Sequence, residues 1–82
     1  MFEKFRIKRK IRALKSQIAE IEKKRERSQS ALTEALLSGK EASDADVDYF
    51  NKYTNHIDIL RKRIRELQNK LEEGNVNNES PQ

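Results

Sequence analysis

The 82-residue chain is small, basic and highly charged, with 39% Asp, Glu, Lys and Arg and a formal net charge of +4. This length allows one small domain, and the absence of cysteine excludes disulfides and thiolate metal sites. No apolar run approaches the roughly 20 residues of a membrane span, and no apolar segment follows the basic N-terminus as in a secretory signal. A cysteine-free chain fits a reducing cytoplasm, which is where we expect it.

The first predicted element is a helix over residues 5–38. Its apolar residues recur in alternating steps of four and three, at Ile7, Ile11, Leu14, Ile18 and Ile21. This heptad spacing is typical of a helix that packs along a single seam. Arg25 and Ser28 interrupt the seam before it resumes at Leu32 and Ala35. The interruption is either a polar layer that sets the helix register or a contact with a partner subunit.

A turn is predicted near residues 39–43. Gly39 suits the left-handed position that follows a helix C-terminus. Ser43 suits an N-cap, with Asp46 three residues later in a variant of the capping box. Asp44 and Asp46 would then lie in the first turn of the next helix, where the helix dipole favours acids.

A second helix is predicted over residues 44–73. Its seam is uninterrupted, with steps of three and four through Phe50, Tyr53, Ile57, Leu60, Ile64, Leu67 and Leu71. Two heptad helices joined by so short a turn indicate an antiparallel hairpin. We therefore divide the chain into a basic extension of the first helix (residues 1–6), the hairpin (residues 7–73) and a polar tail (residues 74–82) predicted to be disordered.

The predicted fold class is all-α, an antiparallel two-helix coiled-coil hairpin. Two helices bury few residues against the entropy of ordering the chain. Near the tip the apolar surface is wider than one seam, so we expect a second copy to cover it in a dimeric four-helix bundle. The candidate self-association residues are Leu36, Leu37, Val47, Tyr49, Phe50 and Ile59.

Catalytic, cofactor and metal sites are not predicted. Asp44, Asp46 and Asp48 match the first ligand positions of an EF-hand, but Tyr49 and Asn55 stand where that loop needs glycine and glutamate. His56 is the single histidine and has no cysteine or second imidazole as a companion ligand. The chain also lacks a glycine-rich phosphate loop and a nucleophile with a base. We expect a protein that is not an enzyme.

The N-terminal segment is the strongest candidate for a binding site. Residues 1–15 hold seven bases and one acid, a net charge of +6, and on a helix Phe2 and Phe5 point nearly opposite the seam. Three interpretations compete: the segment frays without binding anything, inserts into an anionic membrane surface, or contacts a protein or unpaired nucleic-acid bases. The candidate polyanion or partner contacts are Phe2, Lys4, Phe5, Arg6, Lys8, Arg9, Lys10, Arg12 and Lys15.

The pairing of the helices also predicts how charge is distributed. The end of the second helix lies beside the start of the first, so the open end of the rod is basic, whereas residues 32–60 hold six acids and two bases near the tip. A hairpin rod with acids near its tip resembles, over residues 7–73 and in architecture only, the coiled-coil domain of transcript-cleavage Gre factors, which reach into RNA polymerase. The globular domain that accompanies that hairpin in the family is absent from this sequence.

The expected function is that of a small helical interaction module, of the accessory, adaptor or inhibitor type. It would act through helix-face contacts with a protein partner or with a second copy of itself. The alternatives are nucleic-acid binding through the basic open end and peripheral attachment to an anionic membrane surface through Phe2 and Phe5.

Overall fold

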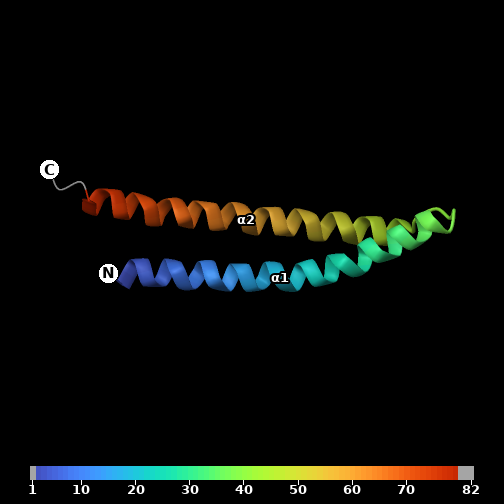
Figure 1. Cartoon of the computed structure of the whole chain (residues 1–82), viewed down its shortest axis with the longest axis horizontal. Helices are drawn as coiled ribbons and strands as arrows, with labels where there is room; N and C mark the ends of the chain where they lie inside the picture. Colours follow the sequence, from blue (N-terminus) through green and yellow to red (C-terminus); the bar gives the residue numbers. More distant parts are fainter. Residues whose placement is uncertain (1, 80–82) are drawn as a thin grey trace.

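The computed structural model describes the backbone of residues 2–79 and the side chains of residues 3–73. The chain folds into two helices, α1 over Phe2–Leu37 and α2 over Asp44–Glu79. They lie side by side in opposite directions, so the start of α1 and the end of α2 meet at an open end, and the turn forms the tip (Figure 1). The rod measures 65 Å by 19 Å by 16 Å. The predicted all-helical hairpin is confirmed.

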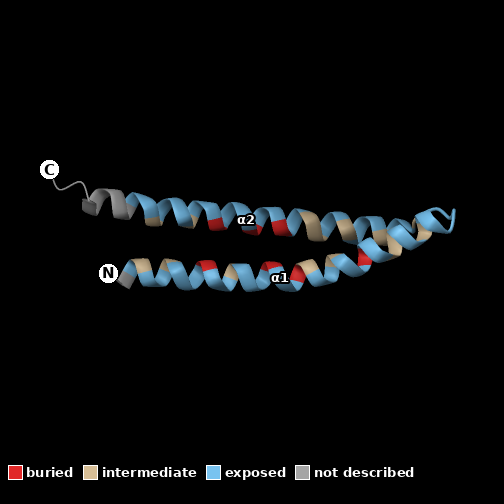
Figure 2. Ribbon diagram, viewed as in Figure 1, coloured by how far each residue is buried: buried red, intermediate tan, exposed pale blue. Residues whose placement is uncertain are grey.

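The core is a single line of side chains between the helices. Its buried members, which are joined by the half-buried Ile7, Leu14, Tyr53, Leu67 and Leu71, are Ile11, Ile18, Ile21, Ile57, Leu60 and Ile64. All of these occupy the predicted seam positions. Figure 2 shows the buried residues on the sides of α1 and α2 that face each other. Among residues 3–73, Ile57 is the one side chain with no exposed surface, so burial is most complete near the middle of the rod.

The polar interruption of the α1 seam is filled by contacts within the hairpin. Ser28 is buried, and Arg25 is half-buried. The Arg25 guanidinium donates a 3.5 Å hydrogen bond to Thr54 Oγ1 and lies 5.9 Å from the centroid of the Phe50 ring. These contacts combine a polar bond with a cation–π interaction. Arg25 therefore has partners on α2.

Backbone hydrogen bonds define the turn at the tip. Gly39 adopts a φ of 70°, its N–H donates to the Leu36 carbonyl at 3.2 Å, and the Lys40 N–H donates to the Ala35 carbonyl at 2.9 Å. This pair of bonds defines a Schellman motif, which closes the end of α1. The Ser43 carbonyl accepts the first bond of α2, from the Val47 N–H at 3.1 Å, so Ser43 stands at the N-cap position.

The helix ends differ from the predicted ones. The backbone is already helical at Phe2, within the predicted basic extension, and α1 ends at Leu37. α2 continues through Gly74 to Glu79, six residues beyond the predicted end at Glu73 and into the segment predicted to be disordered. Glycine and asparagine lower helix propensity without preventing a helix, whereas proline breaks or kinks a helix interior, and the single proline, Pro81, stands beyond Glu79 in the sequence. The rest of the predicted tail, residues 80–82, lies outside the described residues.

Candidate functional site

The basic residues of the open end line two separate hollows. Lys8, Arg12 and Lys15 surround one hollow of about 270 Å³ around Ile11. Lys4, Arg6 and Lys10 of α1 line another, of about 450 Å³, together with Glu3, Ile7, Leu67 and Lys70. Lys10 and Lys70 come from different helices and carry the same charge, so they do not stabilise the hairpin as oppositely charged flanking residues would. Both linings combine several cationic side chains with apolar ones, and the second also contains the acid Glu3.

Phe5 extends the basic surface with an exposed aromatic ring. It is 61% exposed, and the Arg9 guanidinium lies 5.8 Å from its centroid. Phe5 therefore lies off the seam, as predicted, and its exposed ring lies beside the Arg9 guanidinium. The side chain of Phe2, the other aromatic residue of this segment, lies outside the described residues.

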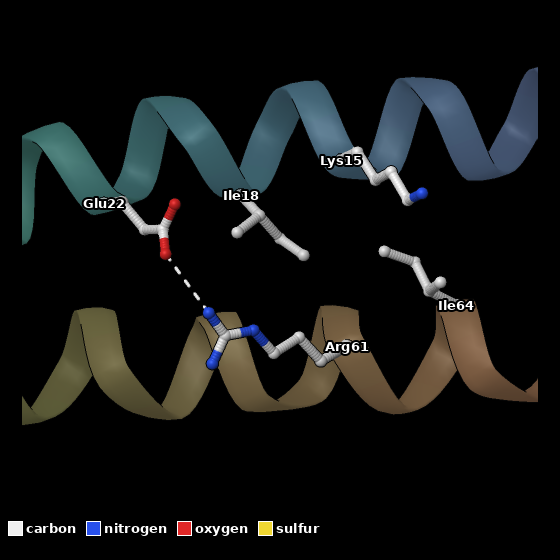
Figure 3. A pocket seen from close by; sticks show the side chains of 5 residues that line it. All are labelled: Lys15, Ile18, Glu22, Arg61 and Ile64. Carbon is white, nitrogen blue, oxygen red and sulfur yellow. Dashed lines mark hydrogen bonds and ion pairs between the residues drawn. The ribbon is translucent and has the colours of Figure 1, made fainter.

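An ion pair marks one side of the rod near its middle. Arg61 of α2 donates to Glu22 Oε2 of α1 at 3.1 Å, and both side chains are about half exposed. Figure 3 shows this pair beside a shallow hollow of about 280 Å³ that is also lined by Lys15, Ile18 and Ile64. An ion pair this exposed adds little stability. The pair does, however, show which side chains of α1 and α2 lie on the same side of the hairpin.

The predicted self-association residues differ in how far they are exposed. Phe50 is half-buried beneath Arg25 and belongs to the seam. The others are exposed, with Leu36 and Leu37 at 79% and 82%, Ile59 at 65%, Tyr49 at 51% and Val47 at 37%. Tyr49 stacks on Tyr53, with ring centroids 6.1 Å apart. The tip thus presents several apolar side chains to solvent.

These exposed residues also fall on different sides of the hairpin. Leu36 is two heptads from Glu22, and Val47 is two heptads from Arg61. Residues separated by whole heptads keep the same side of a coiled coil, so both lie on the side that carries the ion pair. Tyr49 and Ile59 occupy heptad positions on the opposite flank of α2. One partner surface therefore cannot cover all five exposed residues.

The aspartates at the start of α2 are arranged as helix-terminal residues. Asp44 and Asp48 are exposed and Asp46 is half-buried, and Asp44 and Asp46 lie in the first turn. Within the described residues, no three Asp, Glu, His or Cys side chains gather closely enough to hold a metal ion. His56, on the same helix, is exposed.

Protein-family models, curated proteins and solved structures give no match to this chain.

Neither helix of the described region is both long and apolar enough to cross a membrane.

Two interhelical contacts were missed by sequence reasoning, namely the Glu22–Arg61 pair and the placement of Arg25 over Phe50. Assigning each flanking residue its heptad position would have found the first, because Glu22 and Arg61 follow corresponding seam positions and carry opposite charges. The second depends on a side-chain rotamer and has no sequence signal.

Proposed function

We propose that this protein is a non-enzymatic helical interaction module that acts through its helix faces and assembles with itself into a four-helix bundle. The observation that supports this most directly is the exposure of Leu36 and Leu37, at 79% and 82%, beside Val47 at the tip. Leucine side chains gain about 1.5–3 kcal/mol on full burial. Among residues 3–73 six apolar side chains are buried within the hairpin, so the exposed leucines would gain this free energy of burial by association.

Light scattering at micromolar concentration tests the proposal. We expect about twice the 9.7 kDa mass of the chain. Leu36→Glu should reduce the mass towards that of one chain while the helical signal persists at high protein concentration. Gln17→Glu is the matched control, because it adds the same charge to an exposed position on the opposite flank of the same helix. A folded monomer at every concentration would refute self-association.

A second candidate function is polyanion binding at the basic open end. The supporting observation is the hollow that Lys8, Arg12 and Lys15 surround without an acidic residue in its lining. Nucleic-acid binding through phosphates weakens log-linearly with salt, with a slope near one per contact. Titrating DNA, RNA and anionic vesicles at about 50 mM and 200 mM salt distinguishes this function from membrane attachment, which keeps an apolar component.

The decisive variants for this second function are basic-to-glutamine changes at Lys8, Arg9, Lys10 and Arg12, which should abolish most nucleic-acid binding. Phe5→Ser should spare duplex binding and reduce binding to vesicles or single strands, according to which the ring contacts. If neither nucleic acids nor anionic vesicles bind at about 50 mM salt, the basic end serves another partner.

A further inference from the structure

One side of the rod, which we term the Glu22 face, has a charge pattern that reverses across its middle. We define it by the Glu22–Arg61 ion pair and by the residues at whole-heptad distances from that pair. The adjoining outer positions, at whole-heptad distances from Glu26 and Asp58, also belong to it. The Lys15 and Ile18 side chains that share the central hollow with the pair confirm that this side continues towards the open end (Figure 3).

The open half of the Glu22 face is basic. Its exposed members include Lys8, Arg12, Lys15 and Arg65, and Glu72 is its single acid. The tip half is acidic, with Glu26, Asp44 and Asp58, all exposed, and no base at its heptad positions. The ion pair at the centre is neutral overall. The face is therefore positive on one side of its middle and negative on the other.

Apolar residues stand near both extremes of the same face. Phe5, three heptads before Glu26, is exposed at the open end, and Leu36 and Val47 are exposed at the tip. If the rod is turned end over end about the level of Glu22, Phe5 comes within one helical turn of the level of Leu36. Lys15 comes within one turn of the level of Glu26.

We propose that the partner of the Glu22 face is a second copy of this chain, packed in the reverse direction so that the tip of each rod covers the open end of the other. The two-fold axis crosses the rods near Glu22 and Arg61, and every contact then occurs twice. The proposal rests on the self-association proposed above and specifies its surface and direction. In this arrangement the bases of each copy face the acids of the other.

The alternative direction is unfavourable. A tip-to-tip dimer through this face would place Glu26, Asp44 and Asp58 against the same acids of the other copy, and juxtaposed like charges oppose association. The size of the face is sufficient, since extents of 65 Å and 19 Å correspond to a footprint of about 1,200 Å². A standard interface buries about 800 Å² on each partner.

Engineered cysteines test the direction without interference, because the chain has none of its own. Gln29 and Gln68 are exposed, uncharged residues of the Glu22 face. In the reversed dimer Gln29 of one copy lies level with Gln68 of the other, whereas two Gln29 residues are fourteen positions, or about 21 Å, apart. A mixture of Gln29→Cys and isotope-labelled Gln68→Cys, joined by a short bismaleimide, should give mainly the mixed covalent dimer by mass spectrometry.

Gln17→Cys is the matched control, because Gln17 is exposed on the opposite flank of α1 and should not cross-link to Gln29→Cys. A predominance of the Gln29–Gln29 product would show a tip-to-tip dimer and overturn the proposed direction. Dimers by light scattering without a mixed product would also overturn it, while leaving self-association intact. Monomers by light scattering would refute both proposals.

A charge exchange provides an independent test. Lys15 and Glu26 are eleven residues apart on α1, or about 16 Å, which is too far for contact within one chain. Lys15→Glu should weaken the dimer roughly tenfold at low salt, because the altered contact occurs twice. Adding Glu26→Lys should restore the affinity. An equal or greater loss in the double variant would contradict the proposed contact, and so would a dimer unaffected by Lys15→Glu.

Discussion

The core of the hairpin makes a sharp prediction about two isoleucines on α2. Ile57 has no exposed surface, whereas Ile59, two residues later, is 65% exposed. Truncating Ile57 to alanine removes three carbon atoms from the seam, worth about 0.8 kcal/mol each, or about 2.4 kcal/mol in lost burial. The cavity left behind adds to this, but two helices close a gap more easily than a larger core. We therefore expect Ile57→Ala to cost about 3 kcal/mol.

Ile59→Ala is the matched control. It makes the same chemical change, loses about a third as much burial, and gains helix propensity, so its cost should be about 0.5 kcal/mol or less. Urea denaturation followed by the helical circular dichroism signal measures both, at one fixed protein concentration because association would shift the result. For a chain of this size, about 3 kcal/mol lowers the melting temperature by at least about 12 °C. Equal losses for the two variants would show that the seam is misplaced.

Three further predictions concern the turn, the cap and the ion pair, each measured by thermal denaturation. Gly39→Ala should cost about 1–2 kcal/mol because of its φ of 70°, with Gly39→Asn costing less. The added Cβ meets no atom within 4 Å, so the cost comes from the backbone conformation alone, and an undiminished melting temperature would refute the left-handed turn. Ser43→Ala should cost about 1 kcal/mol if the hydroxyl caps α2, while Ser30→Ala on exposed α1 should cost nothing, and equal effects would show that the Ser43 hydroxyl does not cap the helix. A double-mutant cycle with Glu22→Gln and Arg61→Gln should give a coupling below about 1 kcal/mol that disappears in 1 M salt, and a larger, salt-resistant coupling would contradict the observed exposure.

The seam and the turn could be predicted because their causes are local. The spacing of Ile11, Ile18, Ile57 and Ile64 admits a heptad helix and excludes a strand. Gly39 provides a backbone conformation that other residues resist, so its place in the chain fixes the end of α1. The end of α2 was predicted less well, since weak helix formers leave the final turns to a small balance of free energies.

The candidate surfaces were only partly accessible from the sequence. Exposure at Leu36 and Ile59 follows from their positions off the seam, and their heptad positions place them on opposite sides. Which residue of α1 lies level with which residue of α2, however, requires the relative register of the two helices. The Glu22–Arg61 contact supplies that register. The cation–π contact between Arg25 and Phe50 depends on how one long side chain settles across the seam, which composition and spacing do not determine.

The Schellman turn also constrains how such a rod can change in evolution. It joins two helices of 36 residues each and fixes which residue of one faces which residue of the other. Adding residues to one helix alone would shift every pair beyond the insertion, so length can change only by equal additions to both. Each addition must preserve the seam and therefore comes in sevens, about 10 Å of rod at a time. Homologous hairpins of different lengths should accordingly differ in discrete steps, with paired insertions on the two sides of the turn.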